Sequence, residues 1–268
     1  MRQKENLLII FFTVVFLAGC SKVVTNNPAE NILDEIVKRG ELRVGLNAGY
    51  YPFEVQNNKG EIVGLDVALA NEMAKELGVK LTIINTAWDG IIPSLMSKKF
   101  DLIASGMTIT LERAKKVSFS DPYFFTGQTV LLNKKYLGKI TEVSQLNSPS
   151  YTVVAMLGTT GEFAVQKNLP KAKIKVFKGE ADAAQEVAFG RADAFVYDQP
   201  LVLNYYNKFK DKTYTLLEPF TFEPLGFAVR RGDPDFILWL NHFVRQVKGD
   251  GRLQAMVDKY MNNPGWLE

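Results

Sequence analysis

The feature that most constrains the fold is a regular alternation of strand-like and helix-like segments, which begins at Asn31. Strand-like apolar runs occupy residues 42–46 and 80–85, and the segment between them has apolar residues at every fourth position over 65–77. That spacing predicts a helix with one buried face, which Gly78 ends. Strands that alternate with helices are typical of an α/β fold with a largely parallel sheet.

The same alternation starts again after about residue 128, with strands expected at 151–157, 174–177 and 192–197. We therefore expect two similar α/β lobes, each built on a mixed, mostly parallel sheet. Two crossings between the lobes, near residues 123–128 and 219–225, would form a two-strand hinge, and a strand at 225–229 would return the chain to the first lobe. The expected boundaries are 31–125 plus 222–268 for lobe 1 and 126–221 for lobe 2.

The N-terminal segment has the pattern of an export signal. Basic Arg2 and Lys4 precede an apolar run at 7–17 that is too short to span a bilayer, which predicts a signal peptide over 1–19. The run ends in Leu-Ala-Gly-Cys, which resembles the bacterial lipobox, so Cys20 is the expected lipidation site. An ordinary signal peptide with a chance cysteine is the alternative. Residues 20–30 would form a tether.

Charge and composition exclude several classes of function. The net charge is +3 and the lysine pairs are short and scattered, so no nucleic-acid partner is expected. Cys20 is the only cysteine and His242 the only histidine. Disulfides, a thiolate nucleophile, a Ser–His triad and multi-histidine metal sites therefore have little support, and no metal or cofactor is predicted.

One stretch of the first lobe points to a bound anion. A helix is expected at 88–97 and a buried strand at 100–104; a Gly-Met-Thr-Ile-Thr turn follows, and Arg113 then falls in the first turn of the next helix. A cation in that position opposes the helix macrodipole, so a bound anion is one candidate for its partner. The guanidinium can hold a carboxylate through two parallel hydrogen bonds. The alternative is a surface arginine paired with Glu112.

Further candidate residues follow the ends of the expected strands, where ligands of open α/β sheets bind. Asp198 ends a strand and can accept hydrogen bonds from an ammonium group, although it can equally cap the following helix. Tyr50 and Trp88 can form the walls of a ligand slot or belong to the core, and the backbone N–H groups of 158–161 can add to an anion site. A zwitterion between aromatic walls would satisfy this set. The candidate ligand-binding residues are Asn47, Tyr50, Trp88, Ser105, Gly106, Met107, Thr108, Arg113, Leu157, Thr160, Gly161 and Asp198.

Four motifs resemble those of the family-3 extracellular solute-binding proteins, the amino-acid receptors of ABC importers. They are GLDVALANEMAKELG (64–78), WDGIIPSLMSKKFDLIASGMTITLERAKKVSFSDPYF (88–124), GTTGE (158–162) and GRADAFVYD (190–198). The resemblance covers nearly all of residues 31–268. It implies a two-lobed periplasmic-binding-protein type II fold that closes at a hinge around its ligand. It also implies a permease and an ATPase as partners, a monomer, and a lipid-anchored location in the periplasm or at the cell surface.

The resemblance assigns roles to residues by their positions in these motifs. Arg113 is similar to the arginine that grips the α-carboxylate of the ligand, helped by the region of Thr108 and Thr160. Asp198 is similar to the aspartate that holds the α-ammonium group, with Ser105 contributing a carbonyl or hydroxyl oxygen. The implied ligand is a free L-amino acid.

The side-chain preference of the site rests on the same resemblance. Tyr50 and Trp88 are similar to the aromatic pair that sandwiches the ligand side chain. Family members that bind cationic amino acids often carry an acid where this chain has Asn47, so a neutral polar ligand such as glutamine is implied. The aromatic pair could still favour lysine or arginine, with Glu162 or Asp89 as the counter-charge. Polar or cationic amino acids therefore rank first and aromatic ones second.

The rival function is enzymatic, because the same fold hosts cyclohexadienyl dehydratases. Those enzymes need a carboxylate as general acid and do not usually need an aspartate that holds an ammonium group. The combination of Arg113 and Asp198 fits an amino-acid binder better, so the protein is not expected to be an enzyme. A third hypothesis is the ligand-binding module of a sensor. It is not favoured, because no transmembrane or signalling segment is recognised in this sequence.

Overall fold

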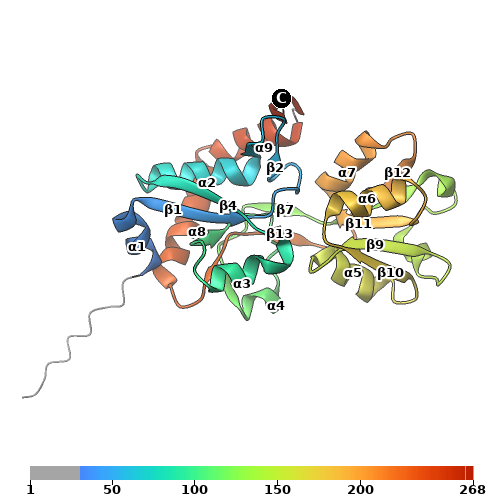
Figure 1. Cartoon of the computed structure of the whole chain (residues 1–268), viewed down its shortest axis with the longest axis horizontal. Coiled ribbons are helices and arrows are strands. Elements are labelled where there is room, and N and C mark those ends of the chain that lie inside the picture. Colours follow the sequence, from blue (N-terminus) through green and yellow to red (C-terminus); the bar gives the residue numbers. More distant parts are fainter. Residues whose placement is uncertain (1–30, 263, 268) are drawn as a thin grey trace, which may run out of the picture. The chain divides into compact units, whose positions relative to one another are not determined.

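The computed structural model describes residues 31–262 and 264–267 of the 268-residue chain (Figure 1). The predicted signal peptide over 1–19, Cys20 and the tether at 20–30 lie outside the described residues. Within the two described ranges, no helix is both long enough and apolar enough to cross a membrane.

Two five-stranded sheets organise the described residues. The first has the order β4 (Lys80–Asn85), β1 (Glu41–Leu46), β5 (Leu102–Ile103), β14 (Ala228–Arg230), β6 (Val117–Phe119). The second has the order β10 (Lys173–Phe177), β9 (Thr152–Met156), β11 (Ala194–Asp198), β8 (Gln128–Asn133), β12 (Thr213–Leu216). In each sheet the first two pairings are parallel and the last two antiparallel. The prediction of an α/β fold with mixed sheets is confirmed. Half of the strand pairings in each sheet are parallel, which is fewer than the alternation of helices and strands alone suggests.

Helices cover both faces of the first sheet. In α2 (Leu65–Glu76) the predicted apolar stripe is fully buried at Leu65, Leu69 and Met73, in the same cluster as Val44 of β1. The other face packs against α3 (Ile91–Met96), whose Leu95 lies in a separate cluster. Each fully buried leucine contributes about 1.5–3 kcal/mol, so these clusters dominate the stability of this half.

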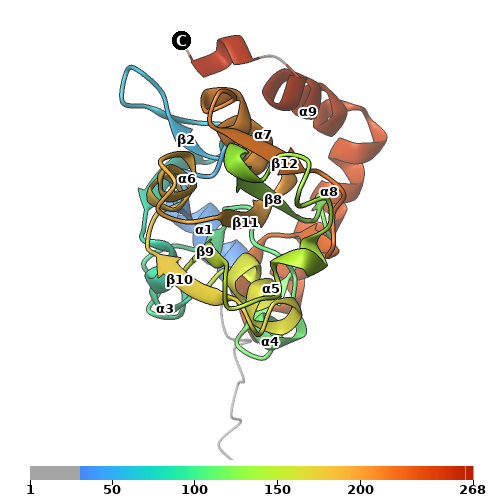
Figure 2. The same cartoon turned by 90° about the vertical axis from the view of Figure 1, so that its right-hand side faces the viewer.

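The second sheet is covered in the same way, because successive side chains of a strand point to opposite faces. Leu131 and Phe195 pack in one cluster with residues of α6 (Glu180–Ala188) and α7 (Gln199–Lys208). Val130 and Val196, their chain neighbours, pack in another cluster with Val165 of α5 (Thr160–Asn168). Figure 2 shows α6 and α7 on one side of this sheet and α5 on the other.

Other described elements include three helices, a hairpin and three 3₁₀ turns. A capped helix, α1 (Ile32–Arg39), begins where Asn31 Oδ1 accepts the Asp34 N–H at 2.8 Å and ends at Gly40, which has a φ of 69°, as the sequence predicts. The others are the hairpin β2 (Val55–Gln56) and β3 (Ile62–Val63), the helices α8 (Pro234–Gly249) and α9 (Arg252–Asn262), and the 3₁₀ turns η2 (Lys134–Tyr136), η3 (Val143–Leu146) and η4 (Pro264–Leu267).

Two strands connect the sheets. β7 (Phe124–Thr126) leads into β8, and β13 (Glu223–Leu225) follows β12. They pair antiparallel, and Figure 1 shows them between the two sheets. The expected lobe boundaries lie in or next to these strands; the division into lobes and movement at a hinge stay predictions.

Three elements differ from the sequence-based expectation. The helix expected at 88–97 is a 3₁₀ turn, η1 (Trp88–Gly90), followed by α3, because Pro93 has no N–H to continue an α-helical ladder from residue 89. The strand expected at 225–229 is divided at Gly226 into β13 and β14. The helix α4 (Leu111–Ala114) is a single turn, so Arg113 lies in its first and last turns alike. The macrodipole argument for an anion beside Arg113 was therefore wrong.

Candidate functional site

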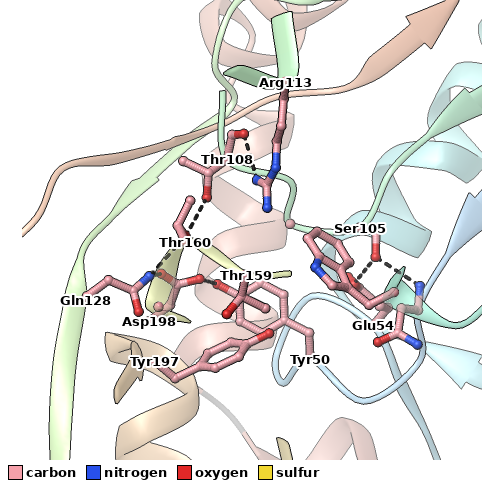
Figure 3. Close-up of a pocket in the computed structure, with 14 residues that line it drawn as sticks. Tyr50, Glu54, Ser105, Thr108, Arg113, Gln128, Thr159, Thr160, Tyr197 and Asp198 are labelled. Carbon is pink, nitrogen blue, oxygen red and sulfur yellow. Dashed lines mark hydrogen bonds between the residues drawn. The ribbon is translucent and has the colours of Figure 1, made fainter. Parts of the chain in front are cut away.

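A pocket lies where the carboxyl ends of β1, β5 and β11 meet the start of α5 (Figure 3). Ligands of open α/β sheets bind at such strand ends. Ten of the twelve residues predicted from the sequence line this pocket: Asn47, Tyr50, Trp88, Ser105, Gly106, Thr108, Arg113, Thr160, Gly161 and Asp198.

The pocket lining does not include the other two predicted residues. Met107 is fully buried in the cluster of α3, and its carbonyl oxygen accepts the Gly226 N–H at 3.1 Å. Leu157 donates its backbone N–H to the carbonyl oxygen of Phe177 at 2.8 Å, which extends the pairing of β9 with β10. Both residues therefore stabilise the scaffold around the pocket in this structure.

Four lining residues were missed by the sequence analysis: Glu54, Gln128, Thr159 and Tyr197. Gln128 begins β8 and lies opposite Asp198 in the antiparallel register, which only the structure reveals. Tyr197 and Thr159 adjoin predicted residues, so their positions carried a weak signal. Glu54 lies next to β2, and no local pattern of the sequence marks it as a pocket residue.

Arg113 is a buried cation that forms no salt bridge with any residue the structure describes. Its Nη1 donates to the carbonyl oxygen of Thr108 at 2.9 Å (Figure 3). Its Nη2 donates to the carbonyl oxygen of Gly158 at 3.4 Å. Burial lowers the pKa of Arg113, and within the described part of the chain the acids Glu223 and Asp198 act on it only at longer range. The surface alternative was wrong: Arg113 is 9% exposed, and Glu112 pairs with Lys115 instead. A carboxylate from a ligand can provide the missing partner.

Asp198 is the acid on the opposite wall of the same pocket. The Tyr50 hydroxyl donates to Oδ2, and Gln128 Nε2 donates to Oδ1 at 2.6 Å. Burial raises the pKa of Asp198 to about 7, although both hydrogen bonds oppose that rise. Asp198 stands at the N-cap position of α7, but its side chain makes no capping hydrogen bond. The carboxylate therefore faces the pocket. An ammonium group bound there would lower its pKa and favour its ionised form.

The aromatic residues form two walls of different kinds. The Trp88 ring lies 5.2 Å from the guanidinium carbon of Arg113, and its Nε1 donates to the carbonyl oxygen of Gly158 at 3.1 Å. The Tyr50 ring packs against Phe53 at 4.6 Å and against Tyr197 at 5.4 Å. Tyr50 therefore belongs to both the core and the pocket, so the two alternatives for this residue are compatible.

The start of α5 supplies backbone donors. Thr159 Oγ1 caps the helix by accepting the Glu162 N–H at 3.3 Å, which leaves the N–H groups of Thr160 and Gly161 in the first turn without intrahelical partners. A Cβ atom on Gly161 would lie 2.9 Å from Gln128 Oε1, so the close approach requires glycine. This helix start can bind a negative group together with Arg113.

The two counter-charges suggested by the sequence lie outside the pocket lining. Glu162 accepts the Gly158 N–H at 2.7 Å and a hydrogen bond from Gln166, so it stabilises the start of its own helix. Asp89 lines a neighbouring groove. Asn47 lines the pocket and donates through Nδ2 to the carbonyl oxygen of Thr86 at 3.1 Å. None of the three supplies a negative charge to this pocket.

A different acid lines the far side. Glu54 is fully buried and accepts a hydrogen bond from Ser105 Oγ at 2.6 Å. Ser105 Oγ in turn accepts the Asn47 N–H at 2.9 Å. Figure 3 shows Glu54 and Ser105 on the side of the pocket opposite Gln128 and Asp198. The pocket thus has two acidic ends.

Comparisons with known proteins agree with this geometry. A family model described as bacterial extracellular solute-binding proteins, family 3, matches residues 42–263. The L-cystine-binding protein TcyJ of Escherichia coli (strain K12) is 32% identical over 256 residues, which are 96% of this chain and 95% of that protein.

Solved structures show the same fold. The ancestral amino acid-binding protein AncCDT-1, described as a precursor of cyclohexadienyl dehydratase, is 49% identical, with a TM-score of 0.80, and covers 86% of this chain and 99% of its own. A putative binding component of an ABC transporter from Wolinella succinogenes DSM 1740, complexed with lysine, is 43% identical, with a TM-score of 0.83, over 85% of this chain and 99% of its own.

Proposed function

Because the chain belongs to the family-3 bacterial extracellular solute-binding proteins, we propose that it binds a free L-amino acid outside the cytoplasm and delivers it to the permease and ATPase of an ABC transporter. One observation carries the proposal: buried Arg113 and buried Asp198 face the same pocket, and within the described chain neither forms a salt bridge. The α-carboxylate and α-ammonium groups of an amino acid match this pair in charge and order.

The proposed contacts follow from the donors and acceptors around the pair. Arg113 and the N–H groups of Thr160 and Gly161 bind the α-carboxylate, while Asp198 accepts from the α-ammonium group. The side chain extends between Trp88 and Tyr50. A polar or cationic amino acid fits best, with glutamine, lysine and arginine as the leading candidates; similarity to a lysine complex and to a cystine-binding protein supports this class.

Delivery requires capture and release, and we assign both to movement of two lobes about β7 and β13. Contacts that join the two sheets line the pocket itself, such as Thr108 Oγ1 and Thr160 Oγ1 at 3.4 Å. A ligand that bridges Arg113 and Asp198 would stabilise the closed arrangement by its greater affinity for it.

The N-terminal residues complete the proposal. Cleavage before Cys20 and lipidation of that cysteine would anchor a monomer to a membrane, in the periplasm or at the cell surface, with residues 20–30 as the tether. The family places the protein outside the cytoplasm, which supports this location.

A thermal-shift screen of ligand-stripped protein tests the function. The mature chain is unfolded, refolded and mixed with each common amino acid, ornithine, cystine and prephenate. A ligand at 100 times its Kd stabilises the folded state by about 2.7 kcal/mol, which gives a shift of several degrees. We expect shifts with a few polar or cationic amino acids.

The rival is the dehydratase, because a 49%-identical ancestral protein is described both as amino acid-binding and as a precursor of that enzyme. A shift with prephenate and none with any amino acid would overturn the transport proposal. Product formation from prephenate would then be the next assay.

A further inference from the structure

A pair of acids lies beneath the end of the pocket that is remote from Asp198. Glu54 and Asp66 are both fully buried, and Glu54 lines the pocket. Two of their oxygens, Glu54 Oε2 and Asp66 Oδ1, are buried and receive no hydrogen bond from a nitrogen or hydroxyl donor among the described residues. Two ionised carboxylates, each with one buried oxygen that has no donor, would be costly, so at least one proton must lie here.

The other carboxylate oxygen of each acid shows which of the two carries the proton. Asp66 Oδ2 accepts two hydrogen bonds, from the Gly106 N–H at 2.6 Å and from the Tyr123 hydroxyl at 2.8 Å. Glu54 Oε1 accepts one, from Ser105 Oγ. The better-solvated Asp66 is therefore the ionised partner, and Glu54 Oε2 holds the proton that it donates to Asp66 Oδ1.

The electrostatic surroundings agree with this assignment. Burial, followed by the negative charge of Asp66, raises the pKa of Glu54 well above its usual range. Burial also raises the pKa of Asp66, but hydrogen bonds from Gly106, Tyr123 and Glu54 oppose that rise and hold it to about 7. The other titratable groups that act on Glu54 or are acted on by it are acids and phenols: Glu180 of α6, Tyr50, Tyr123 and Tyr197. No cation is among them within the described chain, and the hydrogen bond from Ser105, which lowers the pKa of Glu54, is outweighed by burial.

We propose that Glu54 and Asp66 share one proton, and that an amino acid with a cationic side chain displaces it on binding, which makes Glu54 the residue that selects cationic over neutral side chains. The inference rests on the proposed function. In the exchange, the O–H bond of Glu54 breaks, the proton leaves to solvent, and the ligand cation takes its place beside the two carboxylates. A neutral side chain such as that of glutamine leaves the pair protonated.

Counting protons on binding tests this directly. Titration calorimetry at pH 7 in buffers of different ionisation enthalpy gives the protons released per ligand bound. Asp198 can also lose a proton when any α-ammonium group binds, so the informative quantity is the difference between arginine and glutamine. We expect arginine and lysine to release about one proton more than glutamine.

Two substitutions separate the pair. In Glu54→Gln, the amide can still donate to Asp66 and accept from Ser105, so the fold is retained while the titrating group is lost. The extra proton release should disappear, and the ratio of arginine to glutamine affinity should fall at least about tenfold. In Asp66→Asn, the amide donates to Glu54, which is then ionised before the ligand arrives; the extra release should disappear while arginine remains preferred.

The control is Glu186→Gln. Glu186 lies in the last turn of α6 and pairs with Arg191, so its replacement should leave the extra proton release as in the wild type. Equal proton release with arginine and glutamine in the wild type, or an unchanged difference in Glu54→Gln, would overturn the inference. Wild-type binding of glutamine but of neither arginine nor lysine would overturn it and leave amino-acid binding standing. Binding of no amino acid at all would instead refute the proposed function.

Discussion

The two ends of the pocket hold charge in opposite ways. At one end, Arg113 and Asp198 carry opposite charges, and each is oriented by hydrogen bonds from or to fixed neighbours. At the other, Glu54 and Asp66 are two buried acids that share one proton in our proposal, and no cation of the described chain is among the groups that act on them. The first end can bind the groups that every α-amino acid shares, and the second can respond only to what distinguishes one side chain from another.

This difference separates affinity from specificity. Loss of a charge at the Arg113–Asp198 end should weaken every amino-acid ligand alike, whereas a change at the Glu54–Asp66 end should alter the order of preference. A comparison of arginine with glutamine affinity in each variant tests that division.

The largest effect is expected from Arg113→Ala and Asp198→Ala. Each leaves one ligand charge desolvated and unpaired, so binding should weaken by about 2–5 kcal/mol for arginine and glutamine alike. Calorimetric titration measures both ligands. Arg245→Ala, which removes an exposed arginine paired with Asp121, should bind normally. If arginine affinity fell far more than glutamine affinity in Arg113→Ala, the division between the two ends would be wrong.

A smaller effect is expected from Gly161→Ala. The new Cβ would lie 2.9 Å from both Gln128 Oε1 and the Val196 carbonyl oxygen, so the Gln128 amide that orients Asp198 must shift. We expect a loss of stability of about 1–3 kcal/mol, measured by urea unfolding, together with weaker binding of both ligands. Gly249→Ala is the matched control: apart from its own helix and chain neighbours, no atom of the described residues lies within 4 Å of the added Cβ, so the variant should match the wild type or exceed its stability slightly. Equal effects of the two substitutions would contradict the steric argument.

The pH dependence should differ between the ligands. Burial raises the pKa of Asp198 from 3.8 to about 7, so glutamine affinity should rise about tenfold per pH unit up to that pKa and then level off. Arginine affinity should rise more steeply, because the Glu54 proton must leave as well. Equal slopes of log affinity against pH for glutamine and arginine would show that arginine displaces no additional proton from Glu54.

Stability without ligand should change in the opposite direction. The folded protein keeps a proton on Asp198 that the unfolded chain loses above a pKa of 3.8, so this group makes the free energy of unfolding fall as the pH rises from about 4 to about 7. Urea unfolding of the wild type and of Asp198→Asn across this range measures the contribution. A wild-type curve parallel to that of Asp198→Asn would show that Asp198 titrates normally.

The sequence predicts the scaffold better than the chemistry within it. Apolar spacing over 65–77 and the strand-like runs are local signals, so the order of elements follows from them. The approach of Gln128 to Asp198 depends on an antiparallel register between segments 70 residues apart, which leaves no local pattern.

Two site residues show why motif and mechanism must be separated. Arg113 was found through its motif, but the macrodipole argument failed because α4 is one turn long. Glu54 was missed because no local pattern of the sequence predicts the Tyr50–Glu54 bridge, next to which this acid accepts a hydrogen bond from Ser105. Asn47, read as evidence for a neutral ligand, lies beside an acid that the sequence did not place there.

Tyr50→Phe should give the smallest effect and the sharpest comparison, because Tyr50 adjoins both ends of the pocket. Its hydroxyl donates to Asp198 and lowers the pKa of that acid, whereas it makes no hydrogen bond to Glu54. Removal of the hydroxyl should raise the pKa of Asp198, move the pH midpoint for glutamine binding upward and weaken binding at pH 7 by about 0.5–1.5 kcal/mol. The ratio of arginine to glutamine affinity should stay constant, since the Glu54–Asp66 pair keeps all of its hydrogen bonds. A changed ratio would mean that the two ends communicate through Tyr50, and affinity and specificity could then no longer be assigned to separate groups.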